Sequence, residues 1–283
     1  MRRRTVLGLA ALGAAGAVLT ACGEEEERRV APAKGAVRHD YGPGPSQYGE
    51  LHLPEGTPRG VVVVVHGGFW RSQYDAGSLG TPLARDLARR GWAAWNLEYR
   101  RVGPGLGGEG GAPATFDDVA AGIDLLATLD LDTSTVVTLG HSAGGHLATW
   151  AAGRGAHGWS EQVPVTHVVS QAGVLDLRAA ARDYLGAGAV KDFLGHEPTT
   201  ADARYDPAQQ LPLGVPVWCV HGTDDANVPL SQSVDYVARA QAAGGTAELV
   251  EVAGDHFVVI DPASPAWARQ VEILDGINAD ARG

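Results

Sequence analysis

Short apolar runs alternate with longer amphipathic segments from residue 36 onward. The strongest run lies at residues 60–65, where five consecutive valines show no alternation of apolar and polar positions. Such a run is typical of a strand that is buried on both faces of a parallel sheet. Residues 78–90 instead place leucine at helical spacing, and Gly91 follows as a helix stop.

The same reading along the chain predicts eight strands and five helices in one α/β domain. Strands are expected at 36–41, 48–53, 60–65, 92–99, 135–139, 166–171, 213–220 and 247–252, and helices at 78–90, 116–129, 146–152, 230–243 and 265–279. Strands that alternate with helices indicate a mostly parallel sheet with helices on both faces. Residues 174–213 show little periodicity, and we expect them to form a small cap over the site.

The bulk properties agree with one domain of ordinary globular type. The chain has 283 residues, 45% of them hydrophobic, and its formal net charge is -11. Such an acidic chain, with no basic stripe after Arg101, argues against nucleic acid as a partner.

The N-terminus has the features of an export signal. Three arginines at residues 2–4 precede an apolar run to Thr20, which has the length of a signal segment and is short for a membrane span. The run ends in Leu-Thr-Ala-Cys22, which resembles a lipobox. We therefore expect a lipoprotein-type signal peptide at 1–21 and lipidation of Cys22. This places the protein on the outer face of a bacterial membrane, with an uncleaved anchor helix as the alternative.

The remaining cysteine and the following segment fit this organisation. Cys219 lies in an apolar run and is expected to be an inert core thiol. Residues 22–35 are charged and rich in Pro, Ala and Gly, as in a flexible tether, so the folded domain is expected at 36–283.

The strongest chemical signal is a serine between two glycines, Gly140-His-Ser142-Ala-Gly144. It follows the predicted strand at 135–139 and precedes the predicted helix at 146–152. In that context the serine is expected on a tight turn that holds its hydroxyl clear of the sheet. A Cβ at either glycine would collide with the turn or the helix.

A serine hydroxyl needs a base and an orienting acid, because it is a poor nucleophile at neutral pH. In a strand–turn–helix context the chain order is serine, acid, histidine. His256 follows the last predicted strand and is expected at the same sheet edge as Ser142. His221 also follows a strand, but it precedes the acids of that region. Of those acids we favour Asp225 over its neighbour Asp224, since it stands three residues before Val228 and the next helix.

Backbone N–H groups should stabilise the oxyanion that attack by the serine produces. Ala143, which follows the serine, is one expected donor. Gly68 and Phe69 are the others, because the glycines after the buried valine strand let the backbone approach a ligand. His66, His141 and His146 are expected to brace or pack these turns. No His/Asp cluster has metal-ligand spacing, so we expect neither a metal nor a cofactor.

Taken together, these motifs resemble those of the α/β-hydrolase superfamily. They are His66-Gly67-Gly68-Phe69-Trp70, Gly140-His-Ser142-Ala-Gly144-Gly145, His221-Gly-Thr-Asp-Asp225-Ala-Asn-Val-Pro229 and Asp255-His256-Phe257. The first resembles the arylformamidase (kynurenine formamidase) and related carboxylesterase branch. The resemblance implies an α/β-hydrolase fold and hydrolysis of small acyl esters or N-formyl aryl amides. Phe69, Trp70 and the cap would line the pocket.

Two other functions stay open at this point. A serine peptidase or amidase of the prolyl-oligopeptidase type shares the late Asp and His motifs, although the propeller domain usual in that family does not fit in the short N-terminal segment. A catalytically silent binding module on the same fold is the other. Export favours an outward-facing esterase over a formamidase, since tryptophan breakdown is intracellular.

Overall fold

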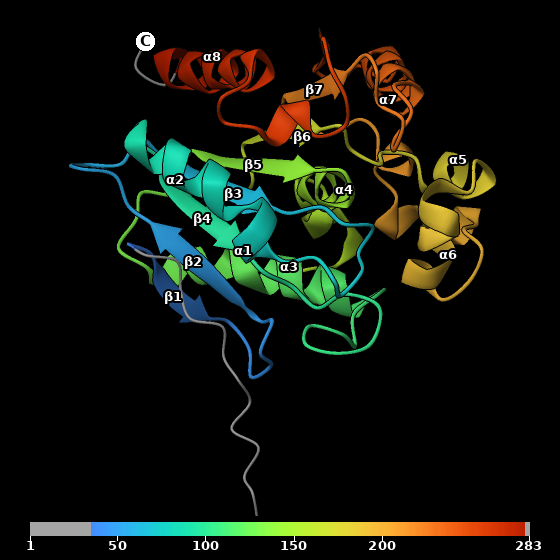
Figure 1. Cartoon of the computed structure of the whole chain (residues 1–283), viewed down its shortest axis with the longest axis horizontal. Helices are drawn as coiled ribbons and strands as arrows, with labels where there is room; N and C mark the ends of the chain where they lie inside the picture. The colour runs from blue at the N-terminus through green and yellow to red at the C-terminus, as the bar shows by residue number, and fades with distance from the viewer. Residues whose placement is uncertain (1–34, 281–283) are drawn as a thin grey trace, which may run out of the picture.

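The computed structural model describes residues 35–280, which fold around one eight-stranded sheet (Figure 1). The strands are β1 (Val37–Asp40), β2 (Tyr48–His52), β3 (Val61–Val65), β4 (Ala93–Leu97), β5 (Val136–His141), β6 (His167–Gln171), β7 (Val217–Gly222) and β8 (Ala247–Val252). The α-helices are α1 (Ala76–Leu79), α2 (Thr81–Arg89), α3 (Ala114–Asp124), α4 (Ala143–Ala151), α5 (Leu177–Arg182), α6 (Ala189–Leu194), α7 (Ser231–Ala242) and α8 (Pro265–Asp280). The 3-10 helices are η1 (Leu125–Thr128), η2 (Arg154–His157), η3 (Leu185–Ala187), η4 (Thr200–Tyr205), η5 (Pro207–Gln209) and η6 (Val258–Ile260).

The sheet has the order β1-β2-β4-β3-β5-β6-β7-β8. β2 pairs antiparallel with both β1 and β4, and all the other neighbours are parallel. The predicted mostly parallel sheet of eight strands is thus confirmed. Because β3, β5, β7 and β8 run in the same direction, the loops that follow them meet at one edge of the sheet.

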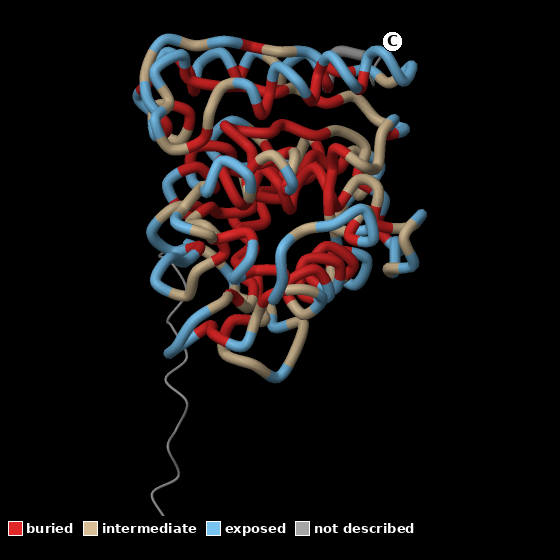
Figure 2. Tube along the Cα trace, turned by 90° about the vertical axis from the view of Figure 1, so that its right-hand side faces the viewer, coloured by how far each residue is buried: buried red, intermediate tan, exposed pale blue. Residues whose placement is uncertain are grey.

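The central strand divides the core in two, because successive side chains of a strand point to opposite faces. Val61, Val63 and Val65 pack with residues of α3, α4 and α7 on one face. Val62 and Val64 pack with α2 and α8 on the other. The buried trace accordingly runs through the middle of the molecule, between outer layers that are exposed (Figure 2).

Two predicted elements differ in their bounds. The strand expected at 213–220 pairs only from Val217, because Pro216 has no N–H to give to the ladder, and it continues to Gly222. The helix expected at 78–90 is divided at Gly80 into α1 and α2. An added Cβ at Gly80 would overlap the side-chain oxygen of Asn96, so the helices meet at a close approach to β4.

The segment between β6 and β7 contains residues 174–213, the expected cap. It consists of α5, α6 and three 3-10 helices, η3, η4 and η5. These elements form the gold lobe beside α7 in Figure 1. None of them exceeds six residues, which explains why the sequence shows no clear helical period there.

The expected signal peptide (1–21), the expected lipidation site Cys22 and almost all of the tether (22–35) lie outside the described residues. Within residues 35–280, no helix is both long enough and apolar enough to span a bilayer.

Candidate active site

Ser142 stands on a strained turn between β5 and α4. Its backbone has φ 56° and ψ −118°, a conformation that costs free energy and that packing must hold in place. An added Cβ at Gly140 would overlap the carbonyl oxygen of Gly144, and one at Gly144 would overlap that of Val65. Both glycines are therefore required by close packing of the strand, the turn and the helix, as the sequence indicated.

His256 and Asp225 form a short hydrogen bond. Nδ1 of His256 lies 2.6 Å from Oδ2 of Asp225, whose side chain is fully buried. The other carboxylate oxygen accepts the backbone N–H groups of Asn227 and Val228, each at 2.8 Å. Burial opposes the negative charge, but the hydrogen bonds from His221, His256 and Val228 outweigh it and hold the pKa of Asp225 well below its usual range.

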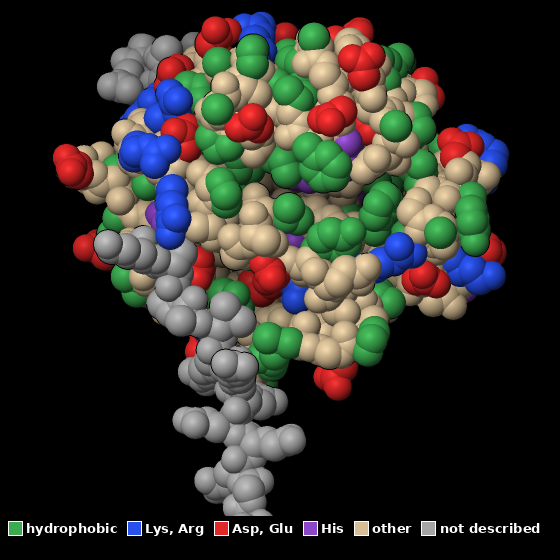
Figure 3. All heavy atoms as spheres, in the orientation of Figure 1, with side chains coloured by type: hydrophobic (Ala, Val, Ile, Leu, Met, Phe, Trp, Pro, Cys, Tyr) green, Lys and Arg blue, Asp and Glu red, His purple; other side chains and the backbone are tan. Residues whose placement is uncertain are grey.

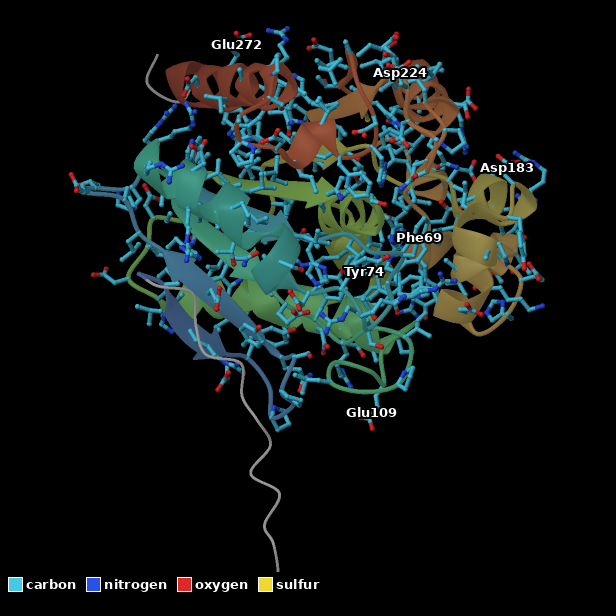
Figure 4. The ribbon with its side chains drawn as sticks, viewed as in Figure 1. Phe69, Tyr74, Glu109, Asp183, Asp224 and Glu272 are labelled. Atoms are coloured by element: carbon cyan, nitrogen blue, oxygen red, sulfur yellow. The ribbon has the colours of Figure 1, made fainter. Side chains whose placement is uncertain are left out.

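The neighbouring Asp224 is exposed. In Figure 4 it lies at the surface near α7. Of the two aspartates that the sequence left open, the structure therefore places Asp225 beside His256.

His141 joins the serine turn to the His256 loop. Its Nε2–H donates to the carbonyl oxygen of His256 (2.9 Å), and the two rings are in contact at a tilt of 46°, with centroids 4.5 Å apart. Burial, together with the nearby His256, lowers the pKa of His141 to about 3, so the ring is a neutral donor at ordinary pH. The hydroxyl of Ser142 forms no hydrogen bond within residues 35–280, and neither does Nε2 of His256. Both atoms are thus available to a ligand, as is common in unliganded active sites.

The three expected oxyanion donors are also unused. In the part of the chain that the structure describes, the N–H groups of Gly68, Phe69 and Ala143 donate to no acceptor. Gly68 and Phe69 are half-buried in the loop after β3, and Ala143 is fully buried at the start of α4. Most such backbone N–H groups are paired within the protein, so three unpaired ones fit donors kept for a ligand. Gly68 and Phe69 both have positive φ, 110° and 53°, and an added Cβ at Gly68 would overlap Tyr74.

A buried cluster that contains charged side chains supports the loop of Gly68 and Phe69. His66 donates from Nδ1 to the carbonyl oxygen of Gly67 (2.8 Å), and its own carbonyl accepts the hydroxyl of Tyr99 (2.7 Å). Nε2 of His66 lies 3.1 Å from Oε1 of Glu98 and 3.4 Å from Nη1 of Arg101, and these two residues pair with each other. Burial and the Arg101 charge lower the pKa of His66 to about 3. The expected bracing role of His66 is confirmed.

Trp70 is a correction to the predicted pocket. It was expected to line the pocket, but its side chain is 1% exposed. Its indole N–H donates to Nδ1 of His146 (3.2 Å), and its ring stacks on Phe193 of the cap, with centroids 4.5 Å apart. Trp70 thus belongs to the apolar core between the loop and the cap, because its ring is covered on both sides.

Phe69 and Tyr74 lie nearer the opening. The ring of Phe69 packs against Gly186 of the cap, and Tyr74 is 38% exposed. Both lie between the sheet edge and the cap lobe in Figure 4. Phe257, next to His256, is 52% exposed. Figure 3 shows this face, where apolar and histidine side chains surround a central hollow.

One residue of the site was missed from the sequence. Nε2 of His221 lies 3.2 Å from Oδ2 of Asp225, so two histidines contact the same carboxylate oxygen. The signal was present, because His221 directly follows the strand predicted at 213–220 and stands four residues before the favoured acid. It was considered only as a base and was set aside on chain order.

The described residues contain no group of three or more His, Cys, Asp or Glu side chains that could hold a metal ion. The groups that meet at this edge are the Ser142 hydroxyl, the His256 imidazole, the Asp225 carboxylate and the backbone N–H groups of Gly68, Phe69 and Ala143.

Comparison with known proteins adds a family. A sequence profile of the BD-FAE family matches residues 50–239, which is 190 of the 283 residues. Two curated relatives are a probable isoprenylcysteine alpha-carbonyl methylesterase of Oryza sativa subsp. japonica and an isoprenylcysteine alpha-carbonyl methylesterase of Arabidopsis thaliana. They are 26% and 25% identical over alignments of 269 and 261 residues, which cover 86% and 84% of this chain. The matches span 64% and 60% of those relatives, less than two thirds of their length.

Solved structures share the fold. A truncated carbohydrate esterase from gut microbiota superposes with a TM-score of 0.74 at 18% identity, over 88% of this chain and 99% of the other. Esterase 2 of Thermogutta terrifontis superposes with a TM-score of 0.70 at 22% identity, over 90% of this chain and 96% of the other. Esterase B of Lactobacillus rhamnosis superposes with a TM-score of 0.74 at 20% identity, over 88% of this chain and 87% of the other.

Proposed function

Because the chain belongs to the BD-FAE family, an esterase family of the α/β-hydrolase fold, we propose that it hydrolyses small carboxylic esters through an acyl-enzyme on Ser142. The observation that carries this proposal is the 2.6 Å hydrogen bond between His256 and a buried, ionised Asp225. It lies at the sheet edge that also presents Ser142 on its strained turn.

In the first half of the reaction, Oγ of Ser142 attacks the acyl carbon while Nε2 of His256 takes the hydroxyl proton. The tetrahedral intermediate expels the alcohol, which receives that proton from His256. In the second half, His256 deprotonates a water molecule, which attacks the acyl carbon. The second tetrahedral intermediate then expels Oγ of Ser142, which receives that proton from His256, and the acid is released. Asp225 keeps the proton on Nδ1 and stabilises the imidazolium that forms in each half.

The charge on the oxygen of each tetrahedral intermediate needs donors that are in place beforehand. The N–H groups of Gly68, Phe69 and Ala143 are the proposed donors, since they have no acceptor among the described residues. The positive φ of Phe69 is consistent with this role, because strained backbone persists at sites where packing holds a donor in a required direction.

N-formyl aryl amides are a narrower candidate substrate. The support is the His66-Gly67-Gly68-Phe69-Trp70 sequence, which resembles that of arylformamidases. The same serine chemistry would cleave the formyl C–N bond. A preference for aminoacyl anilides over esters would instead indicate a peptidase or amidase of the prolyl-oligopeptidase type.

Export and anchoring through Cys22 form a separate proposal, supported by the Leu-Thr-Ala-Cys22 sequence at the end of an apolar run. Lipid labelling in a bacterial host tests it. Incorporation of labelled palmitate that is lost in Cys22→Ser supports anchoring, and equal labelling of both proteins contradicts it.

The proposed activity is tested with p-nitrophenyl esters of increasing acyl length, on the full chain and on Ser142→Ala. Turnover of acetate or butyrate that disappears in the variant supports a short-chain serine esterase, and N-formylkynurenine is then the next substrate. A folded protein with no turnover, whose Ser142 also fails to react with a fluorophosphonate, would be a silent binding module and not an esterase.

A further inference from the structure

The carboxylate of Asp225 lies between two histidines from different parts of the chain. Oδ2 is 2.6 Å from Nδ1 of His256 and 3.2 Å from Nε2 of His221. His221 is the penultimate residue of β7, whereas His256 lies in the loop after β8. Only His256 has a part in the proposed reaction, so the buried ring of His221 is left without an assigned role.

The contacts of His221 determine its tautomer. Its Nε2 is also 3.0 Å from the carbonyl oxygen of Val228, which can only accept a hydrogen bond. Nε2 therefore carries the proton and shares it between Val228 and Asp225. Nδ1 lies 2.8 Å from the hydroxyl of Ser233, which can donate a hydrogen bond to it or accept one from it.

Ser233, His221 and Asp225 repeat the order of a serine–histidine–aspartate site, but they cannot form a second one. The side chains of His221 and Asp225 are fully buried, and Ser233 is fully buried as well. No substrate reaches the Ser233 hydroxyl. The arrangement can therefore act only through Asp225.

We infer that His221 is a positioning residue for the proposed active site, because it fixes the Asp225 carboxylate toward His256 and takes up part of its negative charge. This inference rests on the proposed function. With His221 in place, Asp225 receives four N–H donors: His221 and His256 on Oδ2, and the backbone of Asn227 and Val228 on Oδ1. A carboxylate held by four donors has one orientation, and its charge is spread over all of them.

Loss of the His221 N–H should change both the orientation of the Asp225 carboxylate and the distribution of its charge. The carboxylate gains freedom to turn, which lowers kcat, and its full charge then favours the protonated form of the base. The acid limb of the kcat/KM profile should consequently move to higher pH. Other groups that face this pair stay the same: His141 at the end of β5, and Asp255, whose carboxylate is occupied by the N–H groups of Phe257 and Val258.

A matched pair of variants separates this role from simple packing. His221→Leu removes the donor and keeps an apolar side chain of moderate size. His221→Gln keeps an N–H close to the position of Nε2. We would measure kcat, KM and the pH profile of p-nitrophenyl butyrate hydrolysis for the full chain and for each variant, together with the melting temperature.

In His221→Leu we expect kcat to fall about tenfold with KM nearly unchanged, and the acid limb to move up by about half a pH unit. His221→Gln should keep kcat and the acid limb of the pH profile close to those of the unmodified chain. If the leucine variant does not fold, His221→Asn takes its place, because its amide is too short to reach Asp225.

A folded donor-free variant with wild-type kcat and pH profile, lower only in melting temperature, would overturn the inference. Failure of the proposed function would look different, since the unmodified chain would then show no turnover dependent on Ser142.

Discussion

The indole N–H of Trp70 donates a hydrogen bond to Nδ1 of His146, and the two ring atoms are 3.2 Å apart. The same imidazole donates from Nε2 to the carbonyl oxygen of Tyr205, at 2.7 Å. Burial lowers the pKa of His146 to about 4, so a neutral ring serves as acceptor on one side and as donor on the other. The loop after β3, helix α4 and the cap are therefore joined through one side chain.

This relationship predicts that His146 acts on catalysis from a distance. His146→Phe should leave the buried Trp70 N–H unpaired, which costs about 1–3 kcal/mol, and should loosen the turn that carries the N–H groups of Gly68 and Phe69. We expect kcat to fall about tenfold, less than the loss on removal of an oxyanion donor itself. Steady-state kinetics with a short-chain ester measures the effect.

Trp150 provides the matched control. It lies one turn after His146 on α4 and donates its indole N–H to the carbonyl oxygen of Arg204, at 2.9 Å. Trp150→Phe removes a similar tie to the cap without contact to Trp70. It should lower stability and keep kcat within about twofold, because the oxyanion loop is untouched. Equal losses of kcat in both variants would contradict a specific role for His146.

The two adjacent aspartates should differ sharply in their contribution to activity. Asp225→Asn removes the charge beside His256 and should reduce kcat by about 10³ or more, since the amide stabilises neither the required tautomer nor the imidazolium. Asp224→Asn should be close to wild type, because Asp224 is exposed. Titration with a fluorophosphonate gives the concentration of active sites in each preparation, so that kcat is compared per active site. A larger loss in the Asp224 variant would refute the assignment.

The sequence predicts the fold well, because its signals are local and strong. The five valines of β3 leave little choice but a doubly buried strand, and Gly140 and Gly144 mark a turn that close packing requires. The first and last residues of each element are harder to predict. In β7, for example, pairing begins only at Val217, after Pro216.

Residues whose roles depend on distant partners were harder to predict. Trp70 was expected to line the pocket together with Phe69 and the cap. Its environment is instead set by His146 and by Phe193 of the cap, 76 and 123 positions further along the chain. His221 likewise gains its role only when the β7 and β8 loops are brought together. Such contacts leave no periodic pattern in the sequence.

Stability should fall as the pH is lowered from neutral. Burial lowers the pKa of His66 and His141 to about 3 and that of His146 to about 4, against about 6.5 in an unfolded chain. Between these values the unfolded chain binds three protons that the folded chain does not, so acid favours unfolding. Burial raises the pKa of Asp206 to about 6, which has the opposite sign, because the folded chain then holds a proton that the unfolded chain releases.

Near pH 5 these four groups bind about two more protons in the unfolded chain than in the folded chain, so they should lower the free energy of unfolding by about 3 kcal/mol for each pH unit of acidification. Burial also lowers the pKa of His52 and His157, which acts in the same direction. Urea unfolding followed by tryptophan fluorescence at pH 7, 6 and 5 measures this slope. His146→Gln removes one of the three titrating rings, so the slope of the free energy of unfolding against pH should fall by the contribution of one proton, about 1.4 kcal/mol per pH unit. A free energy of unfolding that stays constant or rises toward pH 5 would show that these rings are not neutral in the folded protein.

Two helical glycines should respond in opposite ways to the same substitution. In Gly144→Ala the new methyl group would overlap the backbone carbonyl oxygens of Val65 and His66, which cannot rotate away as a side chain can. β3 and α4 must then separate, and Ser142 moves with the helix. We expect a loss of about 3 kcal/mol in the free energy of unfolding and a melting temperature lower by about 6–12 °C, with little activity left.

Gly276, in α8, is the control, because no atom lies within 4 Å of a Cβ added there. Gly276→Ala should gain about 0.5–1 kcal/mol from helix propensity alone and keep full activity. Thermal unfolding of the two variants, measured side by side, distinguishes a glycine required by packing from one that is merely tolerated. A stable, active Gly144→Ala protein would mean that the serine turn and β3 are less closely packed than the structure shows.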